Sequence, residues 1–293
     1  MRTRALVVAL AVGLTAGLVG KSAFAHGFGE RYDLPVPLNL FLVGAAATVA
    51  LSFVVIGLFM RRRSASFDYP RYNLLGPTWV GSVLSSRVLL TAIRLVAVAL
   101  FGLVVATALG GTDRPINNLS PTMVWIIWWV GTGYVSALLG NVWMLVNPWK
   151  ITFEWAQAII GGSPGALDQG MFQYPERLDV WPAVAVFLVF AWLENVYTDA
   201  AQPQKLGILI VLYSIVTWAG MAAFGKHQWL RSGEAFSVLF GFFARFSPTE
   251  VISSDTALCG TCDQGCANWG GCVDCYECFE SAEPGRREVN VRP

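Results

Sequence analysis

The sequence predicts an all-α integral membrane protein with about five transmembrane helices and a small cysteine-rich C-terminal module. Of the 293 residues, 55% are hydrophobic and only 13% are charged, and the mean hydropathy is +0.54. A soluble domain with a solvated surface does not reach such values. All six cysteines lie between Cys259 and Cys278. The formal net charge of +1 gives no indication of a nucleic-acid partner, so the expected partner is the lipid bilayer.

Residues 1–25 have the order of a secretory signal peptide. A basic start is followed by an apolar run over residues 5–20 and by an Ala-x-Ala sequence that ends at Ala25. Small residues at this spacing are typical of a cleavage site. We therefore expect cleavage, with an uncleaved first anchor as the alternative, and a mature chain that begins at His26 on the outer side.

The polytopic membrane domain is expected over residues 26–246. Its first span covers residues 38–60, which carry no charge and are long enough to cross about 30 Å of hydrocarbon. Arg61, Arg62 and Arg63 follow at once. Basic loop residues stay on the cytoplasmic side, so this span runs from outside to inside a bacterial inner membrane.

Four further spans and one shorter helix are expected after these arginines. The apolar run over residues 235–246 is too short to cross and predicts an interfacial or re-entrant helix. Trp149, Phe153 and Trp155 are expected to meet the membrane from a cytoplasmic loop over residues 149–179. The spans are expected at about 88–109, 122–146, 181–198 and 206–224.

Five crossings from an outside start place the tail, residues 247–293, in the cytoplasm, where cysteines stay reduced and bind metals. Cys259-x2-Cys262 with Cys272-x2-Cys275 has the spacing of a tetrahedral zinc site. Cys272-x2-Cys275-x2-Cys278 is an alternative start of an iron–sulfur site, and three disulfides are the third reading. The six candidate ligands are Cys259, Cys262, Cys266, Cys272, Cys275 and Cys278.

His26 is a second, less favoured metal ligand. A mature N-terminal histidine offers an α-amine and an imidazole nitrogen to one ion, and nitrogen donors favour copper. Such a site normally takes another histidine, but His227 falls on the opposite side of the membrane in this topology. A surface histidine without a metal is the simpler reading.

Charged side chains within spans are functional candidates. Arg94 lies about two turns from the cytoplasmic edge, from where it can reach the headgroups. Glu194 and Asn195 lie near the outer end of the fourth span. They line a polar pocket with the outer loop over residues 110–121, or else Glu194 pairs with Lys205 at the interface.

Three tryptophans, Trp125, Trp128 and Trp129, begin the third span. They are expected as part of the aromatic belt at the membrane interface. An aromatic substrate slot is the alternative.

Several stretches resemble the fenitrothion hydrolases, a family of bacterial polytopic membrane proteins, and the likeness covers nearly the whole chain. The resemblance implies a membrane-bound hydrolase of organophosphate triesters, with a second membrane subunit or a further C-terminal half. The stretches are His26-Gly-Phe-Gly-Glu-Arg-Tyr-Asp-Leu-Pro-Val-Pro37, Gly233-Glu-Ala-Phe-Ser, Ala244-Arg-Phe-Ser-Pro-Thr-Glu250 and Cys272-Val-Asp-Cys275-Tyr-Glu-Cys278-Phe.

No catalytic residue for this reaction can be assigned from the sequence. Phosphotriester hydrolysis usually takes a water activated by metals in a histidine-rich site, whereas this chain has two histidines on opposite sides. No phosphate loop, nucleophile elbow or dinucleotide fingerprint occurs in the sequence. The alternative is a non-hydrolytic membrane redox or assembly subunit whose tail carries a metal or an iron–sulfur site.

Overall fold

The computed structural model of the chain describes residues 38–60, 71–76, 78–84, 86–160, 170–255, 257–258, 267–268 and 271–291. The chain divides into two compact units, Met1–Asp68 and Tyr69–Pro293. The predicted signal peptide and His26 lie outside the described residues, as do Cys259, Cys262 and Cys266.

In the first unit the described element is helix α2 (Leu38–Met60), which has the bounds predicted for the first span. The described side chains of α2 between residues 40 and 54 are all exposed. A helix that is apolar on every side is stable either inside a protein core or in lipid. The exposure of α2 within its unit therefore agrees with the predicted span.

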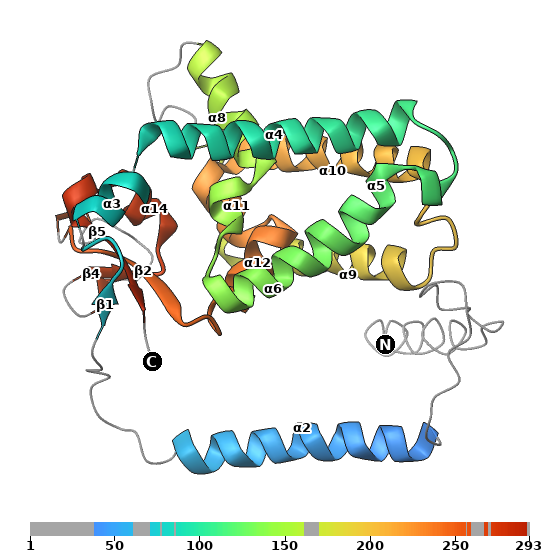
Figure 1. The fold of residues 1–293 in the computed structure, drawn as a ribbon, viewed down its shortest axis with the longest axis horizontal. Coiled ribbons are helices and arrows are strands. Elements are labelled where there is room, and N and C mark those ends of the chain that lie inside the picture. Colours follow the sequence, from blue (N-terminus) through green and yellow to red (C-terminus); the bar gives the residue numbers. More distant parts are fainter. Residues whose placement is uncertain are drawn as a thin grey trace, which may run out of the picture. The chain divides into compact units, whose positions relative to one another are not determined.

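Four helical stretches of the second unit are long and apolar enough to cross a membrane. Helices α4 (Arg87–Gly110) and α10 (Pro203–Phe224) lie side by side (Figure 1). The fourth predicted span forms α9 (Trp181–Asn195), preceded by the 3-10 turn η3 (Glu176–Leu178). The membrane association predicted from composition is therefore confirmed for these helices.

The third span consists of three consecutive helical segments and ends earlier than predicted. Helix α5 (Leu119–Thr122) leads into a π-helix, η2 (Met123–Val130), and then into α6 (Gly131–Leu139). Gly140 has a φ of 100°, a conformation that favours glycine. The Thr249 hydroxyl donates a hydrogen bond to the Leu139 carbonyl at 2.7 Å. The helix therefore stops here and does not continue to residue 146.

The chain after this stop turns inward, although we expected a cytoplasmic loop. Trp149 and Phe153 are buried in an aromatic core and do not meet the membrane surface. The Trp149 indole donates to the Ser214 hydroxyl of α10 at 2.7 Å, which satisfies the polar atom of that ring. The segment comprises α7 (Trp143–Val146) and α8 (Pro148–Ile160).

Helix α12 (Ala235–Ala244) completes the aromatic core. Its Phe236 and Phe240 are 4% and 0% exposed, and the rings of Phe236 and Trp128 lie 4.5 Å apart. The helix that was predicted to be interfacial or re-entrant therefore packs its apolar face against the third span. Helix α11 (Lys226–Ser232) connects α10 to α12.

A small antiparallel sheet, absent from the predicted all-α fold, forms the C-terminal module (Figure 1). Its strand order is β1-β5-β2-β4-β3. Val251 lies opposite Val289, and both are β-branched residues, which suit strands. The first strand comes from residues 72–73, so the module reaches beyond 247–293. The strands are β1 (Tyr72–Asn73), β2 (Thr249–Ser253), β3 (Ala267–Asn268), β4 (Gly271–Val273) and β5 (Arg287–Val291). Short helices accompany them and the spans, namely α3 (Thr78–Leu84), η1 (Pro115–Asn117), α14 (Tyr276–Ser281) and η4 (Pro284–Arg286).

The close approach of α4 and α10 gives a first test. A Cβ on Gly207 would lie 2.7 Å from Leu109 Cδ2 and 3.0 Å from Ala108 Cβ, whereas one on Gly102 would meet nothing within 4 Å. We expect Gly207→Leu to lower the free energy of unfolding by about 1–3 kcal/mol through overpacking. Thermal unfolding in detergent measures it, with Gly102→Leu as the matched control. Equal effects of the two substitutions would contradict this packing.

Candidate functional site: a charged junction and a thiol cluster

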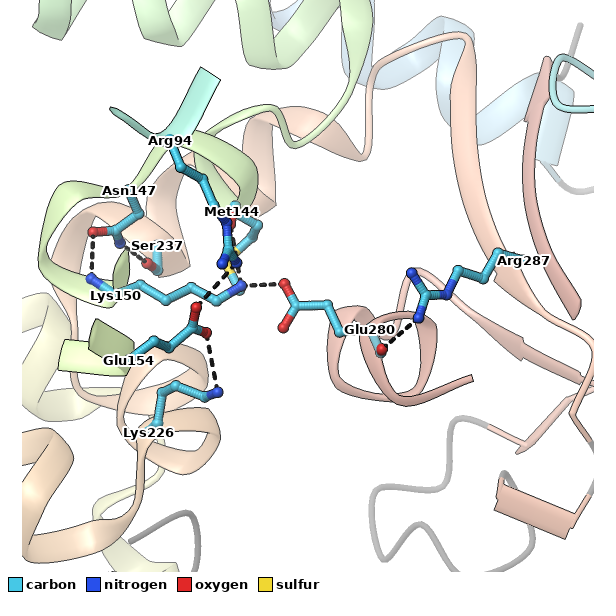
Figure 2. A network of polar contacts seen from close by, with 9 residues as sticks. All are labelled: Arg94, Met144, Asn147, Lys150, Glu154, Lys226, Ser237, Glu280 and Arg287. Carbon is cyan, nitrogen blue, oxygen red and sulfur yellow. Dashed lines mark hydrogen bonds and ion pairs between the residues drawn. The ribbon is translucent and has the colours of Figure 1, made fainter. Parts of the chain in front are cut away.

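The turn between α7 and α8 is organised by Asn147. This side chain is fully buried, and its Oδ1 accepts hydrogen bonds from the backbone N–H groups of Trp149 and Lys150 at 3.0 and 3.2 Å. Its Nδ2 donates to the Ser237 hydroxyl of α12 at 3.3 Å (Figure 2). Asn147 thus caps the N-terminus of α8 and fixes the direction in which Lys150 leaves the helix.

Lys150 is a buried cation, with a side chain that is 1% exposed. Its ammonium group donates to the Met144 carbonyl at 3.2 Å and forms an ion pair with Glu280 of α14 (Figure 2). A buried charge is tolerated only where partners replace its water. The Glu280 backbone carbonyl in turn accepts from Arg287 Nη2 of β5 at 2.8 Å. Lys150 therefore connects the helical part of the second unit to the C-terminal module.

Glu154 lies one turn further along α8 and binds two cations. Arg94 Nη2 of α4 is 3.0 Å from one carboxylate oxygen, and Lys226 Nζ of α11 is 3.1 Å from the other. Figure 2 shows the three side chains converging. Arg94 was expected to extend to the headgroups, but it forms this ion pair instead, since α8 brings a carboxylate within its reach.

The charges around Glu154 decide its protonation. Burial raises the pKa of this carboxyl group, but the positive charges of Lys150, Lys226 and Arg94 outweigh that effect and hold the pKa below its ordinary value. Glu154 is therefore a carboxylate at neutral pH, and it compensates part of the positive charge at the junction.

His227 of α11 lies beside the same charges. Burial lowers the pKa of His227 and Lys226 lowers it further, while the carboxylates of Glu277 and Glu280 act in the opposite direction. The imidazole is thus neutral at pH 7. Because His26 lies outside the described residues, a copper site there stays a prediction.

Three of the six cysteines form a buried cluster in the module. Cys272 of β4, Cys275 at the N-cap of α14 and Cys278 of α14 are 0%, 8% and 3% exposed, and Leu258 packs against them. Asp274, between the first two, has a φ of 53°, and its N–H donates to the Val251 carbonyl at 2.8 Å. A residue in this conformation turns the chain back sharply, as a Cys-x2-Cys knuckle requires.

The other half of the predicted ligand set, Cys259, Cys262 and Cys266, lies outside the described residues. Within the part of the chain that the structure describes, no three His, Cys, Asp or Glu side chains are placed to share one metal ion. A zinc or iron–sulfur site therefore stays a prediction that combines both halves of the set.

The predicted polar residues at the far ends of the spans have structural partners. Glu194 accepts a hydrogen bond from the Trp129 indole at 2.9 Å, and Asn195 donates to the Ala191 carbonyl at 2.8 Å. Lys205, the alternative partner of Glu194, pairs with Asp199 instead. Asn118, in the loop that was predicted to lie outside, caps α5 and donates to the carbonyls of Thr107 and Thr112.

The tryptophans of the third span serve the core more than an interface belt. Trp128 and Trp129 pack against the buried aromatic cluster, and the Trp125 indole donates to the Ala200 carbonyl at 3.1 Å. The Trp125 and Phe190 rings stack at 5.4 Å. Trp128 also lines an apolar cavity of about 500 Å³, and an aromatic substrate slot there stays a prediction.

The ion pairs of Lys150, Glu154 and Glu280 were not predicted from the sequence. A signal existed for the first two, because they occur one turn apart in a stretch rich in aromatic residues, Trp149 to Trp155, and a helix places residues four apart on one face. Nothing local indicated Glu280, which is 130 residues from Lys150.

Comparison of the chain with protein-family models, with curated proteins and with solved structures finds no match.

The ion pairs of Glu154 predict how stability depends on pH. Since its pKa is lowered in the folded protein, the contribution of Glu154 is complete above the ordinary value of 4.5 and is lost as the pH falls through the lowered pKa. We expect Glu154→Gln to cost about 3 kcal/mol at neutral pH and to flatten the acid limb of the stability profile. Unfolding in detergent across this pH range measures both.

Glu176→Gln is the matched control, because Glu176 is exposed and surface substitutions change stability by about 0.5 kcal/mol or less. An acid limb that is equally steep in wild type and Glu154→Gln would contradict the assignment.

The Lys150–Glu280 ion pair is predicted to hold the C-terminal module against α8. Lys150→Met keeps an unbranched side chain of nearly the same length but removes its charge, so Glu280 loses its ion pair with Lys150 and the contact between α8 and α14 weakens. We expect faster maleimide labelling of Cys272, Cys275 and Cys278, measured by mass spectrometry. Lys205→Met removes an exposed ion pair and should leave the labelling rate unchanged. Equal rates in both variants would remove the proposed link.

Proposed function

We propose that this chain is a membrane-embedded, non-hydrolytic metal–thiolate subunit. In this proposal the knuckle of Cys272 and Cys275, together with the knuckle of Cys259 and Cys262, binds one metal ion on the cytoplasmic side. The observation that carries the proposal is that Cys272 and Cys275 are buried next to each other in one cluster, with Asp274 turning the chain between them.

The size of the module supports a metal. Its strands are two to five residues long, and the buried members of its cluster are the three cysteines, with Leu258 packed against them. Strands this short bury little apolar surface of their own, so additional bonds are needed to hold the described strands and α14 together. Thiolate–metal bonds supply this stabilisation when the metal binds.

Zinc is the metal that we favour. It takes four ligands in a tetrahedron and accepts thiolates from paired Cys-x2-Cys knuckles, and Asp274 gives the second knuckle its turn. An iron–sulfur cluster uses the same thiolates and is the alternative. Disulfides would need an oxidising compartment, which the proposed cytoplasmic orientation excludes.

Hydrolysis of organophosphate triesters, which the resemblance implies, stays a prediction, as does a second subunit. The charged groups beside the module pair with one another: Lys150 with Glu280, and Glu154 with Arg94 and Lys226. Paired charges of this kind support a structure, and they favour the role of the junction as a link between metal module and spans.

The test is metal analysis of the purified full chain. We expect about one zinc ion per chain, no visible colour, and loss of both the metal and part of the thermal stability in Cys275→Ser. Ser281→Ala, an exposed change on the same helix, is the control. Thiol labelling in intact and in opened cells reports the side of the membrane.

A visible band that bleaches on reduction would replace zinc by an iron–sulfur cluster. A metal-free protein whose thiols react only after reduction would overturn the proposal in favour of disulfides. Labelling in intact cells would overturn the cytoplasmic orientation.

A further inference from the structure

We infer that the elbow between α3 and α4, residues 78–84 and 86–92, binds one phospholipid with an anionic headgroup. The lipid comes from the leaflet on the side where α4 begins. This inference is independent of the proposed metal site, because its residues lie in α3, in α4 and at the turn between them. It rests on a groove at the elbow, an exposed arginine beside it, and an apolar path that leads from the groove along α4.

The groove lies between the two helices and has a volume of about 410 Å³. Val88 belongs to its lining and is 80% exposed, although it lies in a helix that can cross a membrane. A valine this exposed within a span is in contact with lipid. The groove therefore opens to the bilayer. Four apolar side chains and two hydroxyl groups line it, namely Ser82, Val83, Ser86, Val88, Leu89 and Ala92.

Helix α3 presents an apolar surface beside the groove. Trp79, Val83 and Leu84 are 74%, 55% and 47% exposed, and α3 is too short to be a span. This surface would be costly in water, but it is stable where headgroups meet acyl chains, a depth at which tryptophan is enriched. The elbow is thus placed at the level of the lipid headgroups.

Arg87 supplies a positive charge at this depth. It lies between Ser86 and Val88, which both line the groove, and it is exposed. Within the described residues its guanidinium group has no ion-pair partner, whereas Arg94 on the same helix pairs with Glu154. A guanidinium group forms paired hydrogen bonds with a phosphate. An anionic headgroup is preferred over a zwitterionic one, because no amine cancels the charge of its phosphate.

The apolar path continues from the groove along α4. Ala92 lines both the groove and the cavity of about 500 Å³ beside Trp128, and the lining of that cavity reaches Val104. At 1.5 Å per residue, the path from Val88 to Val104 is about 24 Å long. The hydrocarbon of one leaflet is about 15 Å thick. The path can therefore hold one whole acyl chain of a lipid whose headgroup lies beside Arg87.

The test measures lipid binding to the full chain in detergent by native mass spectrometry, which resolves the first lipid bound. Dioleoyl phosphatidylglycerol and dioleoyl phosphatidylcholine have the same acyl chains and differ in headgroup charge. We expect the first phosphatidylglycerol to bind about fivefold more tightly than the first phosphatidylcholine, as one arginine near an anionic headgroup provides. Glycerol phosphate, which has the phosphate but no acyl chain, should not displace the lipid.

Arg87→Gln should abolish the preference for the anionic lipid. Arg114→Gln is the matched control, because Arg114 is also exposed and lies beyond the other end of α4. Ala92→Leu fills the point where groove and cavity meet and should weaken the binding of both lipids. Ala106→Leu, exposed on the same helix outside both linings, should not. Circular dichroism confirms that each variant is folded.

Four results would overturn the inference. Equal affinity for the two lipids in wild type, or an unchanged preference in Arg87→Gln, would mean that no anionic headgroup is recognised at the elbow. Equal effects of the two leucine substitutions would remove the acyl chain from the path along α4. Displacement of the lipid by glycerol phosphate would mean a site for phosphate groups in general.

Discussion

The arrangement of the second unit depends on one constraint, which is that the ammonium group of Lys150 must be neutralised although it is buried. Asn147 caps α8 so that Lys150 points inward, and the cation needs both a backbone carbonyl and the carboxylate of Glu280. Such a pair contributes little net stability but is costly to break. The role of this ion pair is therefore to specify one arrangement of the fold, since it fixes where α14 can lie relative to α8.

The aromatic core meets a different requirement of the membrane. In lipid the hydrophobic effect gives no driving force between helices, so close packing and buried hydrogen bonds hold them together. The indoles serve both purposes, because Trp149 packs on Tyr213 while its N–H binds Ser214. Trp129 similarly packs in the core and donates to Glu194. This hydrogen bond gives a partner to a carboxylate that lies within a span.

The sequence predicted most of the helices because a span is a local property of about twenty apolar residues. It did not predict features that depend on distant partners. The third span ends at Leu139 through a hydrogen bond from Thr249, 110 residues away. Arg94 was named as a charged residue within a span, but its partner Glu154 was not, because the two residues are brought together only by the packing of α8 against α4. The strand at residues 72–73 is too short for any pattern to reveal it.

The grouping of Cys272, Cys275 and Cys278 followed from their spacing alone, since two residues between successive cysteines allow the chain to bring them to one place. Their burial did not, because it depends on the strands that surround them. Other candidates lost their expected partners for the same reason. Glu194 and Lys205 lie close in sequence, but each found a better donor or acceptor in the folded chain.

The position of β1 in the sheet has a consequence for biosynthesis. Its partner β5 is synthesised long after it, and the adjacent Arg71–Glu250 ion pair joins residues 179 positions apart. At about 5–20 residues per second, roughly ten seconds or more separate the two partners. The spans between them enter the bilayer in that interval, so the sheet closes last. The C-terminal module can therefore act as a check that the helices before it have been inserted.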